Sequence, residues 1–201
     1  MTEPKVHVVD DDAAMRDSVA FLLDSADIPC RTYESAQALL DALPSISAGC
    51  ILTDVRMPGL SGMDLVRRLK AMKVELPVIV MTGHADVPLA IEALKSGVVD
   101  FIEKPFDDEV LLGALREALS RGEQTARRGQ ERGAVQERLD RLSPRERDVL
   151  NGLVAGKANK VIAFDLGISP RTVELYRANL MTKMQAGSLS ELVRMALIAD
   201  P

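Results

Sequence analysis

Five polar side chains within residues 1–104 stand where a short apolar run ends. Asp10 and Asp11 follow the run 6–9, Asp54 follows the run 50–53, and Thr82 follows the run 78–81. Lys104 stands two residues after the run 101–102. Short apolar runs that end in turn residues such as Pro58-Gly59 predict buried strands. Because functional groups gather at the carboxyl ends of parallel strands, we expect these five side chains to meet at one edge of a sheet.

Three carboxylates, a hydroxyl and an ammonium in one place predict phosphoryl chemistry. Clustered carboxylates repel one another, and a divalent cation removes that repulsion. Oxygen ligands without Cys or His favour Mg²⁺. One aspartate can be the nucleophile that forms an acyl phosphate, while Lys104 and Thr82 engage phosphoryl oxygens. The alternative is that the acidic triplet 10–12 only complements the dipole of a following helix.

Strands and helices alternate along residues 6–119. Apolar residues recur at helical spacing in the stretches 19–26, 36–43, 63–69, 87–94 and 110–119. These stretches separate predicted strands at 6–9, 30–33, 50–54, 78–81 and 101–102. Strict alternation of this kind predicts an α/β domain with a parallel sheet that helices cover on both faces.

The remainder of the chain has a different pattern. Residues 120–138 are rich in Arg, Glu, Gln and Gly, which predicts either a solvated helical extension or a flexible tether. The glycines at 122, 129 and 133 argue against a rigid rod. After residue 139 the pattern predicts four short helices at about 144–155, 159–166, 170–184 and 189–198, and Ser143 with Glu146 has capping-box spacing.

Residues 159–173 have the pattern of a helix, a tight turn and a second helix. Gly167 suits the turn, Ser169 suits the N-cap of the second helix, and Pro170 suits its first turn. A helix that starts in this way can enter the major groove of DNA with its N-terminal residues leading. The alternative is a helical hairpin that only packs or dimerises.

Composition limits the remaining possibilities. The 201 residues are 47% hydrophobic and 27% charged, as expected for a globular protein, and no apolar run could cross a membrane. Residues 1–12 lack a secretory signal, and Cys30 and Cys50 lack metal-binding spacing, so we expect a cytoplasmic protein with reduced thiols. Residues 139–201 have a net charge of +2 and the rest −7, which weakly favours a polyanion as partner of the second part.

Residues 5–119 resemble the receiver domain of two-component response regulators. The resemblance rests on Asp10-Asp11, the segment from Asp54 to Met57-Pro58-Gly59, Thr82-Gly83, and Lys104-Pro105-Phe106. It implies a flavodoxin-like (βα)5 fold with strand order 2-1-3-4-5 and a cis bond before Pro105. It also implies that Asp54 accepts a phosphoryl group from a sensor histidine kinase. The implied Mg²⁺ ligands are Asp10, Asp11, Asp54 and the backbone carbonyl of Arg56.

The same resemblance implies a switch. Thr82 moves toward the phosphoryl group and Phe101 turns inward, which couples Asp54 to the surface of the fourth helix and fifth strand. Phe101 could instead be a core aromatic that never moves. We expect phosphorylation to cause homodimerisation through a surface that includes Val87, Ile91, Lys95, Asp100 and Phe101.

Residues 139–201 resemble the LuxR-type helix-turn-helix domain of the NarL/FixJ class, and nearly the whole chain is similar to the FixJ members of that class. The resemblance places one group of residues near base edges, namely Glu174, Leu175 and Ala178. It makes a second group candidates for phosphate or mixed contacts, namely Lys160, Arg171, Thr172, Arg177 and Lys183. Tyr176 stands where many members have His, so the target sequence does not transfer from other members.

Together these features predict a transcription regulator rather than an enzyme, with a receiver at 1–122, a linker at 123–138 and a DNA-binding domain at 139–201. The resemblance to FixJ implies an oxygen-sensing haem kinase as partner, promoter DNA and RNA polymerase as further partners, and activation of nitrogen-fixation or microaerobic genes. Three alternatives stay open. They are a sibling regulator of another pathway, a receiver-like scaffold that is never phosphorylated, and a phosphatase with an Asp nucleophile, against which Arg56 argues because such enzymes need a second Asp there.

Overall fold

The chain divides into two compact units, which are described separately. A computed structural model describes residues 6–83, 91, 93 and 95–199. The first unit is Met1–Ala126 and the second is Arg127–Pro201. The boundary between them falls inside a helix.

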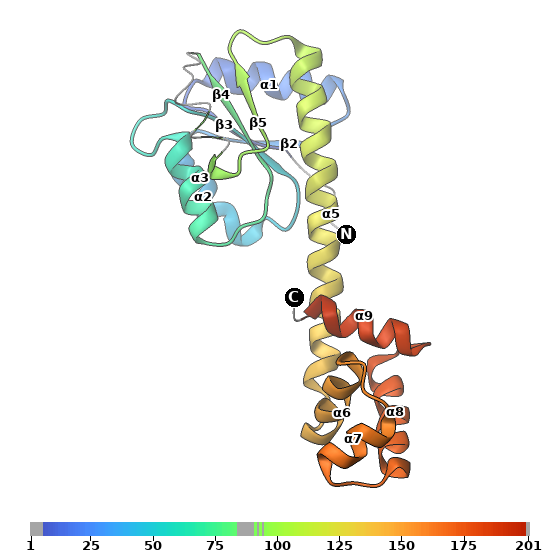
Figure 1. The fold of residues 1–201 in the computed structure, drawn as a ribbon. Helices are drawn as coiled ribbons and strands as arrows, with labels where there is room; N and C mark the ends of the chain where they lie inside the picture. Colours follow the sequence, from blue (N-terminus) through green and yellow to red (C-terminus); the bar gives the residue numbers. More distant parts are fainter. Residues whose placement is uncertain (1–5, 84–90, 92, 94, 200–201) are drawn as a thin grey trace. The chain divides into compact units, whose positions relative to one another are not determined.

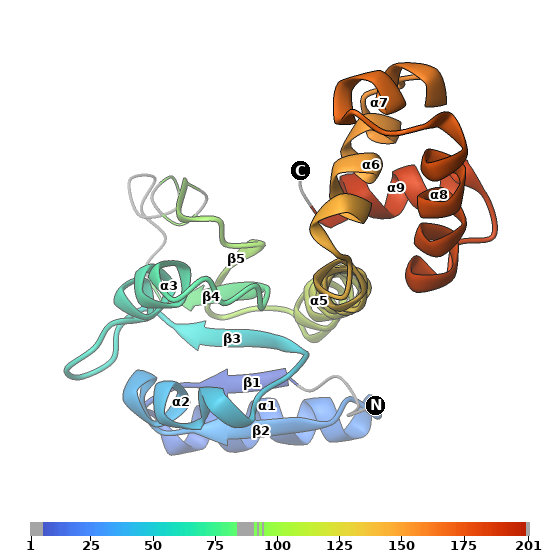
Figure 2. The same ribbon diagram turned by 90° about the horizontal axis from the view of Figure 1, so that it is seen from below.

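The first unit contains a five-stranded parallel sheet, which can be followed in Figures 1 and 2. Its strands are β1 (Val6–Val9), β2 (Cys30–Tyr33), β3 (Cys50–Asp54), β4 (Val78–Thr82) and β5 (Asp100–Glu103). They lie in the order β2-β1-β3-β4-β5, as Figure 2 shows. This order confirms the flavodoxin-like topology that the resemblance implied. The parallel register places Val9 beside Thr53 and Asp54 beside Met81, so the strands end at a common edge.

Helices cover both faces of this sheet (Figure 1). Helices α2 (Ala36–Ala42) and α3 (Gly62–Ala71) contribute Leu39 and Leu65 to the core on one face. Helices α1 (Ala13–Ser25) and α5 (Asp108–Asp140) contribute Leu23 and Leu115 to the core on the other. A short 3₁₀ helix, Leu43–Ser45, follows α2. Most of the fourth predicted helix, 87–94, lies outside the described residues.

The second unit is entirely helical in the described residues. Besides the end of α5, its helices are α6 (Pro144–Val154), α7 (Asn159–Leu166), α8 (Pro170–Met184) and α9 (Leu189–Ala199), within about a residue of the predicted bounds. Ser143 and Glu146 form the predicted capping box of α6. Gly167 has a left-handed backbone conformation with φ of 65°, which a glycine adopts without strain. A core of Leu150, Ile162, Val173, Leu180 and other apolar side chains joins the four helices.

The predicted linker is helical. α5 continues without interruption from Asp108 to Asp140, through all three glycines of this stretch. A glycine in a helix costs only about 1 kcal/mol relative to alanine. Pairs spaced four residues apart support the exposed helix, including Arg121 with Glu117 and Arg127 with Glu131. The glycines therefore do not interrupt the helix.

Candidate functional site

The ends of three strands bring an acidic pair and an ammonium together, as predicted. Asp10 follows β1, Asp54 ends β3 and Lys104 follows β5. The Nζ atom of Lys104 lies 2.8 Å from Oδ2 of Asp10 and 2.7 Å from Oδ1 of Asp54. Both aspartates are buried, with 2% and 7% of their surface exposed. Three ionisable groups far apart in the sequence thus form one buried cluster.

Backbone amides fix the carboxylates within this cluster. The amide of Arg56 donates to Oδ2 of Asp54 at 2.6 Å, and the amide of Asp12 donates to Oδ1 of Asp10 at 2.9 Å. Each carboxylate therefore has one oxygen on the backbone and one on Lys104. Because the amide of Lys104 donates to the carbonyl of Thr82, the ends of β4 and β5 are held together as well.

The ammonium of Lys104 is stabilised in its charged form. Burial alone lowers the pKa of this group, but hydrogen bonds and charge from Asp10 and Asp54 outweigh burial, so the pKa is raised. The ammonium compensates the two carboxylates that would otherwise repel each other. Lys104 is therefore a cation at neutral pH.

Asp11 and Asp12 differ from the two buried aspartates. Asp11 is exposed. Asp12 is the N-cap of α1, and its Oδ1 accepts from the amide of Ala14 at 2.9 Å. The alternative interpretation of the acidic triplet as a helix start is thus correct for Asp12. It does not account for Asp10 and Asp54, which contact Lys104.

The donor set suits a hard cation, although the side chains do not form a ready-made metal cage. Within the described part of the chain, no three acidic, histidine or cysteine side chains are grouped closely enough to hold a metal ion. Lys104 itself bridges Asp10 and Asp54. A position between two buried carboxylates that accepts an ammonium is also suitable for an oxygen-liganded cation such as Mg²⁺. Of the predicted ligands, Asp10 and Asp54 share Lys104, Arg56 contacts Asp54 through its amide, and Asp11 is exposed.

Two residues near this cluster were not predicted. Nη1 of Arg16 donates to the carbonyls of Asp10 at 2.8 Å and Asp11 at 3.0 Å, which fixes the acidic loop. Gly62 begins α3, and a Cβ atom there would collide with the carbonyl oxygen of Asp54. Only the Ser61-Gly62 sequence at a helix start hinted at this close approach, and nothing in the sequence pointed to Arg16.

The predicted switch residues lie on β4 and β5. Thr82 is buried at the end of β4, and Phe101 is partly buried against the core. Of the predicted dimer surface, Ile91, Lys95 and Asp100 are exposed, and 46% of the Ile91 surface is accessible. Val87 lies outside the described residues.

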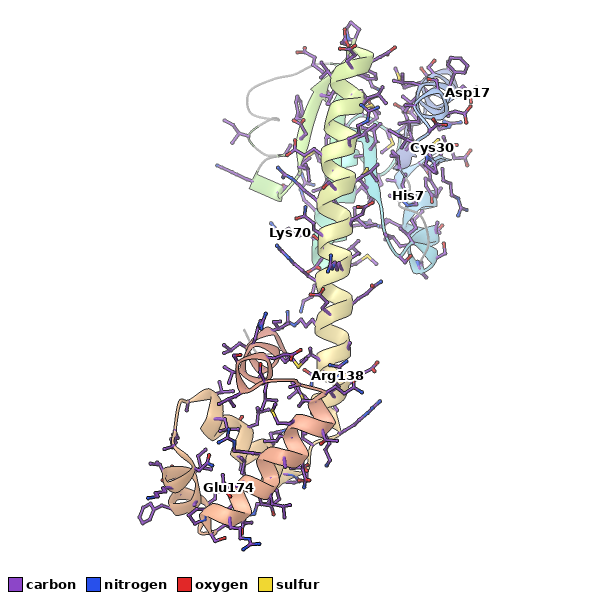
Figure 3. The ribbon with its side chains drawn as sticks, turned by 90° about the vertical axis from the view of Figure 1, so that its right-hand side faces the viewer. His7, Asp17, Cys30, Lys70, Arg138 and Glu174 are labelled. Atoms are coloured by element: carbon purple, nitrogen blue, oxygen red, sulfur yellow. The ribbon has the colours of Figure 1, made fainter. Side chains whose placement is uncertain are left out.

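α8 presents an exposed stripe of side chains along one face. Arg171, Glu174, Leu175 and Ala178 are exposed at helical spacing, and Glu174 is labelled in Figure 3. Val173, Leu180 and Met184 on the opposite face are buried. Ser169 caps the helix and its hydroxyl contacts that of Thr172 at 2.8 Å. The predicted base-edge residues therefore share one accessible face of α8, and the opposite face is buried.

Two of the side chains that we predict to contact phosphate also contact groups of the protein. Nζ of Lys183 lies 2.7 Å from Oε2 of Glu146, which is 3% exposed. Nη1 of Arg177 donates to Oδ1 of Asn159 at 2.7 Å. In addition, Arg138 of α5, labelled in Figure 3, donates to the carbonyl of Met184 at the end of α8. Lys160 and Arg171 are exposed.

Comparisons with known proteins agree with this two-part architecture. The response regulator receiver domain model matches residues 6–116, and the model of bacterial regulatory proteins of the luxR family matches residues 140–196. The chain is 57% identical over 194 residues to the transcriptional regulatory protein FixJ of Azorhizobium caulinodans, covering 96% of this chain and 92% of that one. It is 54% identical over 198 residues to FixJ of Bradyrhizobium diazoefficiens, covering 98% and 97%.

A solved structure of the response regulator StyR is also similar. It has a TM-score of 0.85 and 34% identity, and the match covers 98% of this chain and 99% of that one. No helix in the described residues is both long and apolar enough to span a membrane. The chain belongs to the two-component response regulators, as a FixJ-like transcription factor that joins a receiver domain to a LuxR-type DNA-binding domain and is not an enzyme.

Proposed function

We propose that a sensor histidine kinase phosphorylates this regulator on Asp54, with Mg²⁺ bound beside it, and that phosphorylation promotes dimerisation and binding to promoter DNA. The observation that carries the proposal is the contact of partly buried Lys104 with both buried aspartates, Asp10 and Asp54. A buried carboxylate that shares one cation with a neighbouring carboxylate is suited to receive an anionic group, because positive charge is already in place.

Phosphoryl transfer needs little covalent chemistry from the protein. The N–P bond of a phosphohistidine breaks and its electron pair stays on the imidazole, while an oxygen of Asp54 forms the new P–O bond. Asp10, Asp11, Asp54 and the carbonyl of Arg56 would hold Mg²⁺, which supplies charge neutralisation for the phosphoryl oxygens. Lys104 can exchange its contact with Asp54 for a phosphoryl oxygen, since both are oxygen anions.

The proposed response passes along β4 and β5. Thr82 ends β4, and its carbonyl accepts from the amide of Lys104. A new phosphate on Asp54 attracts the Thr82 hydroxyl, and Phe101 follows it inward. The exposed Ile91, Lys95 and Asp100 then change their surroundings, which favours pairing of two receivers. Two paired DNA-binding domains bind two half-sites more tightly than one domain binds one.

The regulated process follows from the curated relatives rather than from the site. Because FixJ proteins are 48–57% identical to this chain, we propose oxygen-responsive control of nitrogen-fixation or microaerobic genes, with a FixL-like haem kinase as donor and RNA polymerase as the downstream partner. The alternative is a sibling regulator of another pathway, since members of this class share the receiver chemistry.

The test is phosphorylation by a small phosphodonor. The chain is incubated with acetyl phosphate and Mg²⁺ and run on a gel that retards phosphoproteins. We expect a retarded band for the parent and for Asp24→Asn, an exposed control on α1, and none for Asp54→Asn or without Mg²⁺. A retarded band with Asp54→Asn refutes Asp54 as the acceptor. No band with the parent favours the unphosphorylated scaffold.

A further inference from the structure

Arg177 differs from the other cations of the helix-turn-helix. It is partly buried, and its Nη1 lies 2.7 Å from Oδ1 of Asn159. Lys160 and Arg171 are exposed and, within the described residues, make no side-chain hydrogen bond or ion pair. Arg177 is therefore held in place before any ligand arrives, while the other two side chains stay free to move.

The partner of Arg177 is itself fixed. Asn159 is the first residue of α7, and α7 is anchored by Ile162 and Ala163 in the core of the second unit. Asn159 accepts through its amide oxygen, because a guanidinium offers only donors. One of the five N–H groups of Arg177 is thus used, and four remain for a ligand. An arginine that is already ordered loses less rotamer freedom when it binds.

The position of Arg177 favours a phosphate over a base edge. The exposed stripe of α8 runs through Arg171, Glu174 and Ala178, whereas Arg177 lies on the side that faces α7. In helix-turn-helix proteins the second helix enters the major groove and the first crosses the sugar-phosphate backbone. A guanidinium held between the two helices is therefore nearer the backbone than the bases.

We propose that Asn159 is a positioning residue, which holds the Arg177 guanidinium for contact with a DNA phosphate. This inference rests on the proposed binding of DNA by α8. It makes Asn159 act on DNA only through Arg177. The competing explanation is that the Asn159–Arg177 hydrogen bond merely ties α7 to α8.

The two explanations differ in how substitutions combine. The full-length chain, treated with acetyl phosphate, first selects duplexes from a random-sequence pool. Dissociation constants for the best duplex and for an unrelated duplex are then measured across a range of salt concentrations. The variants are Asn159→Ala, Arg177→Gln and the double variant, and urea denaturation of each checks the fold. Arg171→Gln, alone and with Asn159→Ala, is the matched control on the exposed stripe.

We expect Arg177→Gln to weaken binding about tenfold on both duplexes and to reduce the salt slope by about one, as for loss of a phosphate contact. Asn159→Ala should weaken binding by a smaller factor. The double variant should bind no more weakly than Arg177→Gln, because Asn159 then has nothing to position. In the Arg171→Gln background, Asn159→Ala should weaken binding by the same factor as it does in the parent.

Two results overturn the inference alone. One is that Asn159→Ala weakens binding as much in the Arg177→Gln background as in the parent. The other is that Asn159→Ala lowers stability but leaves affinity and salt slope unchanged. If the parent enriches no duplex and binds none, the proposed DNA-binding function fails, and the inference fails with it.

Discussion

Glu146 is a buried acid of the second unit with partners on two helices. Its Oε2 accepts from Nζ of Lys183 at 2.7 Å and from the amide and hydroxyl of Ser143 at 2.8 and 2.9 Å. It therefore caps α6 and also ties the start of α6 to the end of α8. We predict that Glu146→Gln and Glu146→Ala separate these two roles, because glutamine still serves in a capping box.

The expected loss of stability follows from how exposed the two partners of the ion pair are. A hydrogen bond to a charged partner contributes about 1.5–3 kcal/mol when buried. The Lys183 side chain is 40% exposed and keeps part of its hydration, so we expect Glu146→Gln to cost about 1 kcal/mol. Glu146→Ala also loses the cap, which contributes about 1 kcal/mol more, and removes the carboxyl side chain that Lys183 contacts. Its total cost should be about 2–3 kcal/mol.

The measurement is urea denaturation followed by circular dichroism. The matched control is Asp64→Asn in the capping box of α3. Asp64 pairs with Arg67, and both side chains are exposed, Asp64 by 43% and Arg67 by 54%. We expect it to cost less than about 0.5 kcal/mol. If Glu146→Gln cost no more than Asp64→Asn, or if Glu146→Ala cost no more than Glu146→Gln, the reasoning from burial would be refuted.

The pH dependence of the same residue has a definite sign. The hydrogen bond from Lys183 and those from Ser143 hold the pKa of Glu146 below its ordinary value of 4.5, although burial opposes them. A carboxylate with a lowered folded-state pKa adds stability above the ordinary value, and that stability is lost as pH falls through the folded-state pKa. The parent should therefore lose its advantage over Glu146→Gln below about pH 4.5, measured as the difference between their urea midpoints.

Three further predictions concern glycines and thiols. Gly62→Ala should destabilise the chain by about 2 kcal/mol or more in urea denaturation, because the added methyl group collides with the Asp54 carbonyl, and an unchanged midpoint would contradict this. Gly129→Ala and Gly133→Ala should each raise helicity and stability by about 0.5–1 kcal/mol, because nothing lies within 4 Å of the new methyl groups, and a lower midpoint would count against an ordered helix there. Cys50 should resist a thiol reagent at pH 8 in the folded chain, since burial raises its pKa to about 12, and mass spectrometry showing rapid labelling of Cys50 would disprove this.

The sheet and the acidic cluster could be predicted because their signals are local. Apolar runs that end in polar residues predicted four of the five strands, and the parallel order that the resemblance implied then brings Asp10, Asp54 and Lys104 together. The capping box of α6 and the left-handed Gly167 likewise depend on residues next to each other in sequence. Such features need no knowledge of tertiary contacts.

The features that the sequence did not predict depend on tertiary contacts. The contact of Lys183 with phosphate stays a prediction, but its contact with buried Glu146, 37 residues away, was not foreseen. The continuous α5 depends partly on Val135, which is buried in the core of the second unit and which no periodic pattern in the linker revealed. Gly62 was overlooked because its role is to make room for the Asp54 carbonyl, and only the Ser61-Gly62 sequence at a helix start hinted at this tertiary contact.

The central claim is that a phosphoryl group on Asp54 controls DNA binding. Nuclease footprinting of the selected duplex with the parent and with Asp54→Asn, each with and without acetyl phosphate and Mg²⁺, tests it most directly. We predict that the phosphodonor lowers the protein concentration needed for protection by at least about tenfold in the parent and has no effect on Asp54→Asn. Equal protection with and without the phosphodonor, or the same gain in Asp54→Asn, would contradict the claim.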